Sequence, residues 1–184
     1  MVVGIRRSHR GHGSARDSVV LAAMSDLGGL PYDLTDPIDD AFGHFVETGI
    51  TAWSSDGINF RLLVPFEFVR PTRVGGQVIT VIADATTDGA SVPLALALLG
   101  ITRAGEEVWM PAIVHDAAYR GRLLVDGVPT LLEKPTCDLL LFEGMRAKGM
   151  PELKARAYFN GVVELGQSAF DSDRAALAQK GVQI

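Results

Sequence analysis

The stretch PAIVHDAAYRGR, residues 111–122, sets a histidine and an aspartate inside an otherwise apolar segment. Apart from His115 and Asp116, its first eight residues are all apolar, and this pattern predicts a core helix over about residues 106–120. His115 and Tyr119 are four residues apart, so they share one face of that helix. A buried carboxylate is costly unless it is paired, hydrogen-bonded or bound to a metal. We therefore expect a partner for Asp116 and for both ring nitrogens of His115.

The next helix is predicted over residues 136–148, between a proline start signal and a break at residues 149–151. Asp138 lies on the same stripe as the apolar residues three, four and seven positions further on, so its carboxylate should point inward. Two helices joined by a loop pack roughly antiparallel, which would bring Asp138 to the His115 ring or the Tyr119 hydroxyl. A carboxylate that holds one imidazole nitrogen leaves the other as a general base. The same three residues could equally form a purely structural polar network.

A polar turn, TTDGASVP (residues 86–93), follows a β-branched strand predicted over about residues 77–83. Its oxygen-bearing side chains are those of Thr86, Thr87, Asp88 and Ser91. Such a turn can supply ligands to a hard cation. Ser91 is a candidate nucleophile, although no Gly-x-Ser-x-Gly pattern surrounds it. The simpler interpretation is a helix cap formed by Asp88 or Ser91, with Pro93 in the first turn of the next helix.

The other patterns predict an α+β fold. Alternating Phe, Leu and Val residues predict one or two strands across residues 58–70, and no strand is predicted beyond Val92. A third helix is predicted over residues 151–170, followed by a frayed helical tail. Strands and helices in separate blocks are typical of α+β rather than of a doubly wound parallel sheet. We therefore predict a small antiparallel sheet followed by a three-helix bundle.

We predict that the first 50 residues form an N-terminal helical arm. Residues 1–15 are rich in Gly, His and Arg, residues 14–27 have helical spacing, and a short helix is predicted over residues 37–47. The predicted organisation is a basic arm with short helices (1–50), one α+β domain (51–171) and a C-terminal tail (172–184).

Composition excludes several classes of protein. The 184 residues carry a net charge of −5, which provides no overall attraction to nucleic acid or to an anionic membrane. A lone cysteine, Cys137, allows no internal disulfide. No apolar run approaches the roughly 18 residues of a membrane helix, and no signal-peptide pattern follows the N-terminal charges. We therefore expect a protein that acts inside a cell or is carried within a particle.

Four short motifs follow one another along the chain. They are TDGASVP, AIVHDAAY, CDLLLFEGMRAKGM and AYFNGVVELG, at residues 87–93, 112–119, 137–150 and 157–166. Together they resemble the family catalogued as domain of unknown function 1353, which is common in tailed phages and prophages. The resemblance covers about residues 58–170. The polar residues shared with the family's pattern are Thr87, Asp88, Ser91, His115, Asp116, Tyr119 and Asp138.

The HDAAY motif, followed by a helix with an inward aspartate, is similar to the core of secreted His-Asp phospholipases. That similarity implies His115 as the general base for a water and Asp116 as a metal ligand, with Asp88 of the polar turn as a second ligand. Tyr119 and Asp138 would support the histidine, and the metal would polarise an ester carbonyl. The glycine-rich calcium loop and the disulfides of those enzymes are missing from this sequence.

Two hypotheses of function follow. The first is a phage-associated, metal-assisted hydrolase that acts on an ester-type lipid or envelope substrate, with calcium as the first choice of divalent cation. The second is a non-catalytic virion or host-interaction (anti-defence) protein, in which the polar residues only hold the helices together. We favour the first, because clustered ionisable groups cost stability that a purely structural site could avoid. Either protein would act in the host cytoplasm or in the virion, with the phage particle or a host protein as partner.

Overall fold

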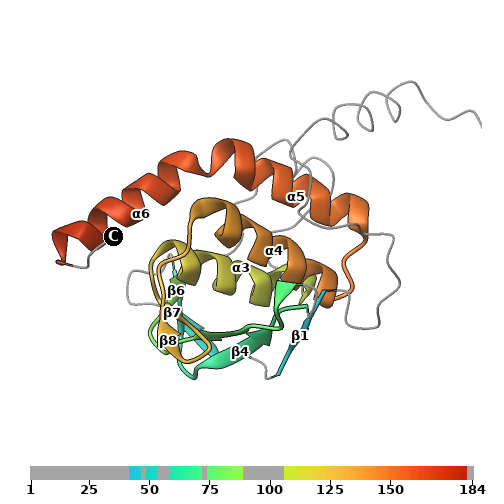
Figure 1. Ribbon diagram of the computed structural model, residues 1–184, viewed down its shortest axis with the longest axis horizontal. Helices are drawn as coiled ribbons and strands as arrows, with labels where there is room; N and C mark the ends of the chain where they lie inside the picture. Colours follow the sequence, from blue (N-terminus) through green and yellow to red (C-terminus); the bar gives the residue numbers. More distant parts are fainter. Residues whose placement is uncertain (1–41, 47–48, 54–58, 72–73, 89–105, 182–184) are drawn as a thin grey trace, which may run out of the picture.

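The computed structural model describes residues 42–46, 49–53, 59–71, 74–88 and 106–181 (Figure 1). In these residues the strands pair antiparallel and the helices pack above them, so the predicted α+β class is confirmed. The expected N-terminal arm and its helix over residues 14–27 lie outside the described residues, as does Ser91.

The larger sheet has five strands in the order β1-β4-β5-β7-β8. They are β1 (His44–Phe45), β4 (Phe66–Val69), β5 (Val78–Val81), β7 (Leu123–Val125) and β8 (Val128–Pro129). In β4, Phe66 and Phe68 alternate with less buried residues and point to one side of the sheet. Their partners across the sheet, Val81 and Ile79, are buried as well. This apolar face is the surface on which the first described helix packs.

A second, smaller sheet holds β2 (Thr51–Trp53), β3 (Phe60–Leu62) and β6 (Thr86–Thr87), with β3 in the middle. Phe60 pairs with Thr87 and Arg61 with Thr86. Because β6 opens the polar turn, this pairing fixes where the two threonines of the turn lie.

The described helices are α3 (Glu106–Tyr119), α4 (Lys134–Ala147), α5 (Glu152–Leu165) and α6 (Gln167–Gln179). α3 lies between the sheet and α4, and α5 and α6 form the top layer in Figure 1. Because α3 is covered on both sides, Ile113, Val114 and Ala117 are all 0% exposed. This explains why the segment is apolar all round rather than along one stripe. None of the described helices is long and apolar enough to cross a membrane.

A buried ion pair ties the larger sheet to α4. Arg70, at the end of β4, donates from Nε and Nη2 to the two carboxylate oxygens of Glu143, both at 2.8 Å. Glu143 is 0% exposed and Arg70 6% exposed. A third nitrogen of Arg70 donates to Oε1 of Gln77 at 3.0 Å. The bidentate geometry offsets part of the cost of taking both charges out of water.

Two expectations for the C-terminal helices are wrong. The helix expected over residues 151–170 is two helices, α5 and α6, that meet at Gly166. A Cβ atom at Gly166 would lie 2.4 Å from the carbonyl oxygen of Val162 and 2.9 Å from the Tyr119 hydroxyl, so the chain passes very close to α3 here. The tail predicted from residue 171 onward is helical as expected, but as far as Gln179 it is a regular part of α6 rather than frayed, and the described residues hold four helices where the sequence predicts a three-helix bundle.

The strands expected across residues 58–70 are β3 and β4, and the next expected strand is β5. The expectation that strands end at Val92 is wrong, because β7 and β8 form a hairpin beyond it. Asp126 and Gly127 make its turn, with φ of 50° and 77°. These left-handed values are what an Asp-Gly pair adopts in a tight hairpin.

The helix expected over residues 37–47 is also wrong at its C-terminal end, where His44 and Phe45 form β1. Phe45 packs against Phe68 with 4.8 Å between the ring centroids. Packing on the sheet therefore overrides the local helical preference of these residues.

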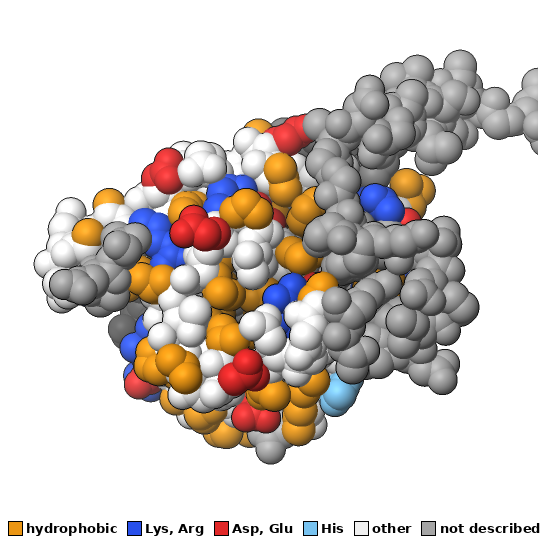
Figure 2. All heavy atoms as spheres, viewed as in Figure 1, with side chains coloured by type: hydrophobic (Ala, Val, Ile, Leu, Met, Phe, Trp, Pro, Cys, Tyr) orange, Lys and Arg blue, Asp and Glu red, His pale blue; other side chains and the backbone are white. Residues whose placement is uncertain are grey.

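On the described part of the face seen in Figure 2, basic, acidic and apolar side chains are interspersed. The charges of both signs are mixed there, in keeping with the small net charge of the chain.

Candidate active site

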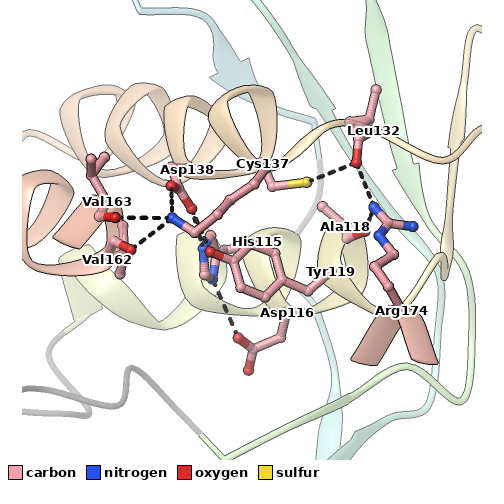
Figure 3. A network of polar contacts seen from close by, with 11 residues as sticks. His115, Asp116, Ala118, Tyr119, Leu132, Cys137, Asp138, Val162, Val163 and Arg174 are labelled. Atoms are coloured by element: carbon pink, nitrogen blue, oxygen red, sulfur yellow. Dashed lines mark hydrogen bonds and ion pairs between the residues drawn. The ribbon is translucent and has the colours of Figure 1, made fainter. Parts of the chain in front are cut away.

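The polar residues of α3 and α4 meet in one network between the two helices (Figure 3). α3 contributes His115, Asp116 and Tyr119, and α4 contributes Lys134 and Asp138. The rings of His115 and Tyr119 are in tilted contact, with 4.2 Å between their centroids, and both reach the carboxylate of Asp138. The structure thus brings together the three residues that helical spacing places on facing sides.

Asp138 is the centre of the network. Its Oδ1 accepts a hydrogen bond from the Tyr119 hydroxyl at 2.6 Å and lies 3.1 Å from Nε2 of His115. Its Oδ2 accepts from Nζ of Lys134, also at 2.6 Å. Asp138 is 1% exposed, so these donors replace water around the carboxylate. Burial raises the pKa of Asp138, but hydrogen bonds from His115, Lys134 and Tyr119 outweigh burial and lower it.

Both ring nitrogens of His115 face a carboxylate, and Asp138 is the nearer of the two. An ionised carboxylate only accepts hydrogen bonds, so we assign the proton of the neutral ring to Nε2, 3.1 Å from Asp138, and the lone pair to Nδ1. Nδ1 faces the opposite side, where Oδ1 of Asp116 is 3.4 Å away. Burial lowers the pKa of His115, but hydrogen bonds and charge interactions with the two carboxylates outweigh burial, and the pKa is raised.

The Nδ1 side of His115 is the more open side of the network. The side chain of Asp116 is 16% exposed, compared with 1% for that of Asp138. Oδ2 of Asp116 accepts a hydrogen bond from Thr87 of β6 at 2.6 Å. The exposed residue Asp88 follows Thr87 in the chain. The polar turn therefore begins next to the face of His115 that could meet a substrate.

The described residues do not complete a cation site. Asp116, Asp88 and Thr87 offer the oxygen atoms that calcium prefers. Among the described residues, however, no group of three or more His, Cys, Asp and Glu side chains is placed to hold a metal ion. Asp116 directs one oxygen to Thr87 and the other to His115.

Lys134 is a member of the network that sequence reasoning missed. It is the first residue of α4, and its Nζ is buried against Asp138 four residues later. Nζ also donates to the carbonyl oxygens of Val162 at 2.9 Å and Val163 at 3.3 Å, near the end of α5. The available signal was the spacing of four between a lysine and an inward aspartate on one helix.

Two arginines contact the C-terminal end of α3, next to Tyr119. Arg120 pairs with Asp173 of α6 at 3.4 Å. Arg174 of α6 is buried and donates to the carbonyl oxygen of Ala118 at 3.3 Å. Positive charge at a helix C-terminus is favourable, so α6 caps the helix that carries the network.

The chain matches a family model described as protein of unknown function (DUF1353) over residues 60–162. The match covers more than half of the chain and includes all five network residues. The chain belongs to the DUF1353 family. No curated protein and no solved structure matches the chain. Membership of DUF1353 confirms the resemblance seen in the motifs. The family is described as one of unknown function, so its name assigns no activity to the network.

Proposed function

We propose that this DUF1353 protein is a hydrolase in which His115 is the general base and Asp138 orients it. The observation that carries the proposal is the contact of 3.1 Å between Nε2 of His115 and Oδ1 of Asp138, which leaves Nδ1 on the more open side. A base held in one tautomer by a buried carboxylate is the arrangement that activates water in many hydrolases.

The proposed reaction is hydrolysis of an ester. Nδ1 of neutral His115 takes a proton from water as the water oxygen attacks the ester carbonyl. The imidazolium that forms is stabilised by Asp138 through Nε2–H, and by Asp116 on the other side. When the bond between carbonyl carbon and alkoxy oxygen breaks, Nδ1 returns the proton to the alkoxide. The products are a carboxylic acid and an alcohol.

The substrate class and setting are part of the proposal. The similarity of the HDAAY motif to secreted phospholipases favours an ester-type lipid or envelope component. The motifs of the family favour a phage or prophage protein that acts in the host cytoplasm or within the virion.

A divalent cation at Asp116, calcium before zinc or manganese, also stays a proposal, and no step of the reaction above depends on it. Calorimetric titration of calcium into wild type and Asp116→Asn tests it. The metal-assisted form expects binding to wild type that disappears in the variant. Wild type that binds no calcium at millimolar concentration would remove the cation and leave the proton transfer by His115 as it stands.

The second candidate function is the non-catalytic virion or host-interaction protein, and the charge balance of the network favours it. Lys134 compensates Asp138, and Tyr119 and His115 take the other carboxylate oxygen, so the network is satisfied without a substrate. On this reading the residues only join α3 to α4.

Turnover separates the two candidates. Short-chain and long-chain aryl esters and phospholipid vesicles are offered to wild type, His115→Gln and His44→Gln, the last being the same substitution at an exposed histidine. The hydrolase proposal expects the rate of His115→Gln to fall about 100-fold or more, while His44→Gln keeps the rate of wild type.

The rate of the proposed hydrolase should also depend on pH. Because the pKa of His115 is raised above 6.5, the rate should keep rising with pH beyond that value. Equal rates in the folded variants, or no turnover of any substrate, would favour the non-catalytic protein.

A further inference from the structure

Lys134 is buried at a place where a lysine is costly. Its side chain is 10% exposed, and it is the first residue of α4, where the positive end of the helix dipole disfavours a cation. An ammonium group taken out of water needs a charged partner and further acceptors. Nζ finds the carboxylate of Asp138 and two carbonyl oxygens of α5, and these contacts compensate the burial.

The contact of Lys134 divides the two oxygens of Asp138 between different partners. Oδ2 is 2.6 Å from Nζ of Lys134, whereas Oδ1 serves both Nε2 of His115 and the Tyr119 hydroxyl. Without a donor on Oδ2, the carboxylate could turn away from the His115 ring, and Asp116, 3.4 Å from Nδ1, could then draw the proton to the other nitrogen. The plane of the carboxylate, and with it the position of the imidazole, would then no longer be set.

We propose that Lys134 is a positioning residue, which holds Oδ2 of Asp138 so that Oδ1 alone orients the His115 ring and fixes its Nε2–H tautomer. The catalytic consequence rests on the proposed hydrolase function, but the positioning itself does not. Lys134 never touches the substrate. It acts through Asp138, from the side of the network that faces α5.

The carbonyl oxygens of Val162 and Val163 extend this role to the end of α5. They accept hydrogen bonds from the same Nζ that contacts Asp138, so the lysine bridges α5 and the carboxylate. Gly166, immediately after α5, passes close to the Tyr119 hydroxyl. The end of α5 and the following Gly166 therefore contact two of the three donors to Asp138, which are Lys134 and Tyr119.

The rival interpretation is that Lys134 only joins α4 to α5. Both interpretations expect Lys134→Met to be less stable, so stability does not separate them. The state of the His115 ring does, because a purely structural lysine leaves the tautomer unchanged as long as the protein is folded.

The experiment is ¹⁵N NMR of the full chain with labelled histidine and lysine, at one alkaline pH at which the ring is neutral. In wild type we expect the Nε2–H tautomer of His115 and Lys134 ammonium protons that are protected from exchange. In Lys134→Met we expect loss of the hydrogen-bonded Nε2–H signal, with recovery in Lys134→Arg, which keeps a cation. Lys154→Met, at an exposed lysine of α5, should leave the signal in place.

An unchanged His115 spectrum in folded Lys134→Met would overturn the inference. Unprotected Lys134 ammonium protons in wild type would also overturn it, even if no variant folds. If the spectrum changes as expected but wild type hydrolyses no ester, the hydrolase proposal fails and the positioning role stands. If an active enzyme is found, Lys134→Met should lower kcat and leave KM unchanged.

Discussion

At the scale of the residue, Asp138 distributes its two oxygens among three donors, and this decides what His115 can do. Nε2 faces this carboxylate at 3.1 Å, so Nδ1 is the nitrogen that would take the proton in the proposed hydrolase. Asp116 lies on that side, in contact with both His115 and Thr87. The ring is thus held between two carboxylates of different burial, and that of Asp116 is partly exposed.

The raised pKa of His115 predicts how stability depends on pH. A raised folded-state pKa means that the charged ring stabilises the fold fully below the ordinary value of 6.5. That contribution is lost as the pH rises through the higher pKa of the folded protein. The difference in free energy of unfolding between wild type and His115→Gln should therefore shrink with rising pH.

Urea denaturation between mildly acidic and alkaline pH measures this difference. His44→Gln, at an exposed histidine of β1, serves as the matched substitution. A difference between wild type and His115→Gln that grows as the pH rises would contradict the two-carboxylate environment of the ring.

The residues of the site were predictable where a single helix carried the information. The spacing of four between His115 and Tyr119, and the apolar stripe around Asp138, were enough to place the three on facing helices. Lys134 was not predicted, because it precedes the helix pattern and looks like a solvated start residue. The contact of Thr87 with Asp116 depends on pairing between β3 and β6, which no local pattern shows.

At the scale of the element, α3 owes its character to its place between the sheet and α4. Its segment 111–118 is apolar on all sides, so the two ionisable residues within it lie between packed layers. Helix α3 was predictable almost to its ends from its apolar run, and α4 from its proline start signal, its apolar stripe and the break at residues 149–151. The strands β1, β2 and β6 have two or three residues each, too few for alternation to be seen.

The junction of α5 and α6 shows why one helix became two. The sequence around Gly166 has helical spacing on both sides, and the break lies where the chain comes close to Tyr119, a tertiary contact that no local pattern shows. The hairpin of β7 and β8 is a different case. An Asp-Gly pair is a known hairpin signal, so the turn at Asp126 and Gly127 could have been predicted, although the short strands beside it show no clear alternation.

Gly166→Ala tests the close approach directly. A Cβ atom there would meet the Val162 carbonyl at 2.4 Å and the Tyr119 hydroxyl at 2.9 Å, so α6 or Tyr119 has to move. We expect the free energy of unfolding to fall by about 1–3 kcal/mol, as for other substitutions that overpack a buried contact. Thermal and urea denaturation measure the change. A stability equal to or above that of wild type would show that a Cβ atom fits at this junction without overlap.

At the scale of the whole molecule, layers are joined by charge as well as by apolar packing. Arg70 and Glu143 connect the larger sheet to α4. The Lys134 contacts connect α4 to α5, and Arg174 connects α6 to α3. The sequence predicts that most strands precede the helices. It does not predict the pair of Arg70 and Glu143, because these residues are 73 positions apart and no local pattern relates them.

Glu143→Gln should be strongly destabilising. It leaves the buried guanidinium of Arg70 without its anion, and breaking such a pair costs about 3–5 kcal/mol. The matched control is Glu152→Gln, which breaks a partly exposed ion pair with Arg156 that is expected to contribute about 0–1 kcal/mol. Urea denaturation of both variants measures the contrast. Equal, small effects would show that Arg70 is compensated in another way.

The ¹⁵N shifts of labelled histidine in wild type, recorded at alkaline pH, show which nitrogen of neutral His115 carries the proton. We predict a proton on Nε2, hydrogen-bonded to Asp138, and an unprotonated Nδ1 on the side of Asp116. A proton on Nδ1 instead would contradict this prediction, because the nitrogen that faces the open side could then take no proton from water.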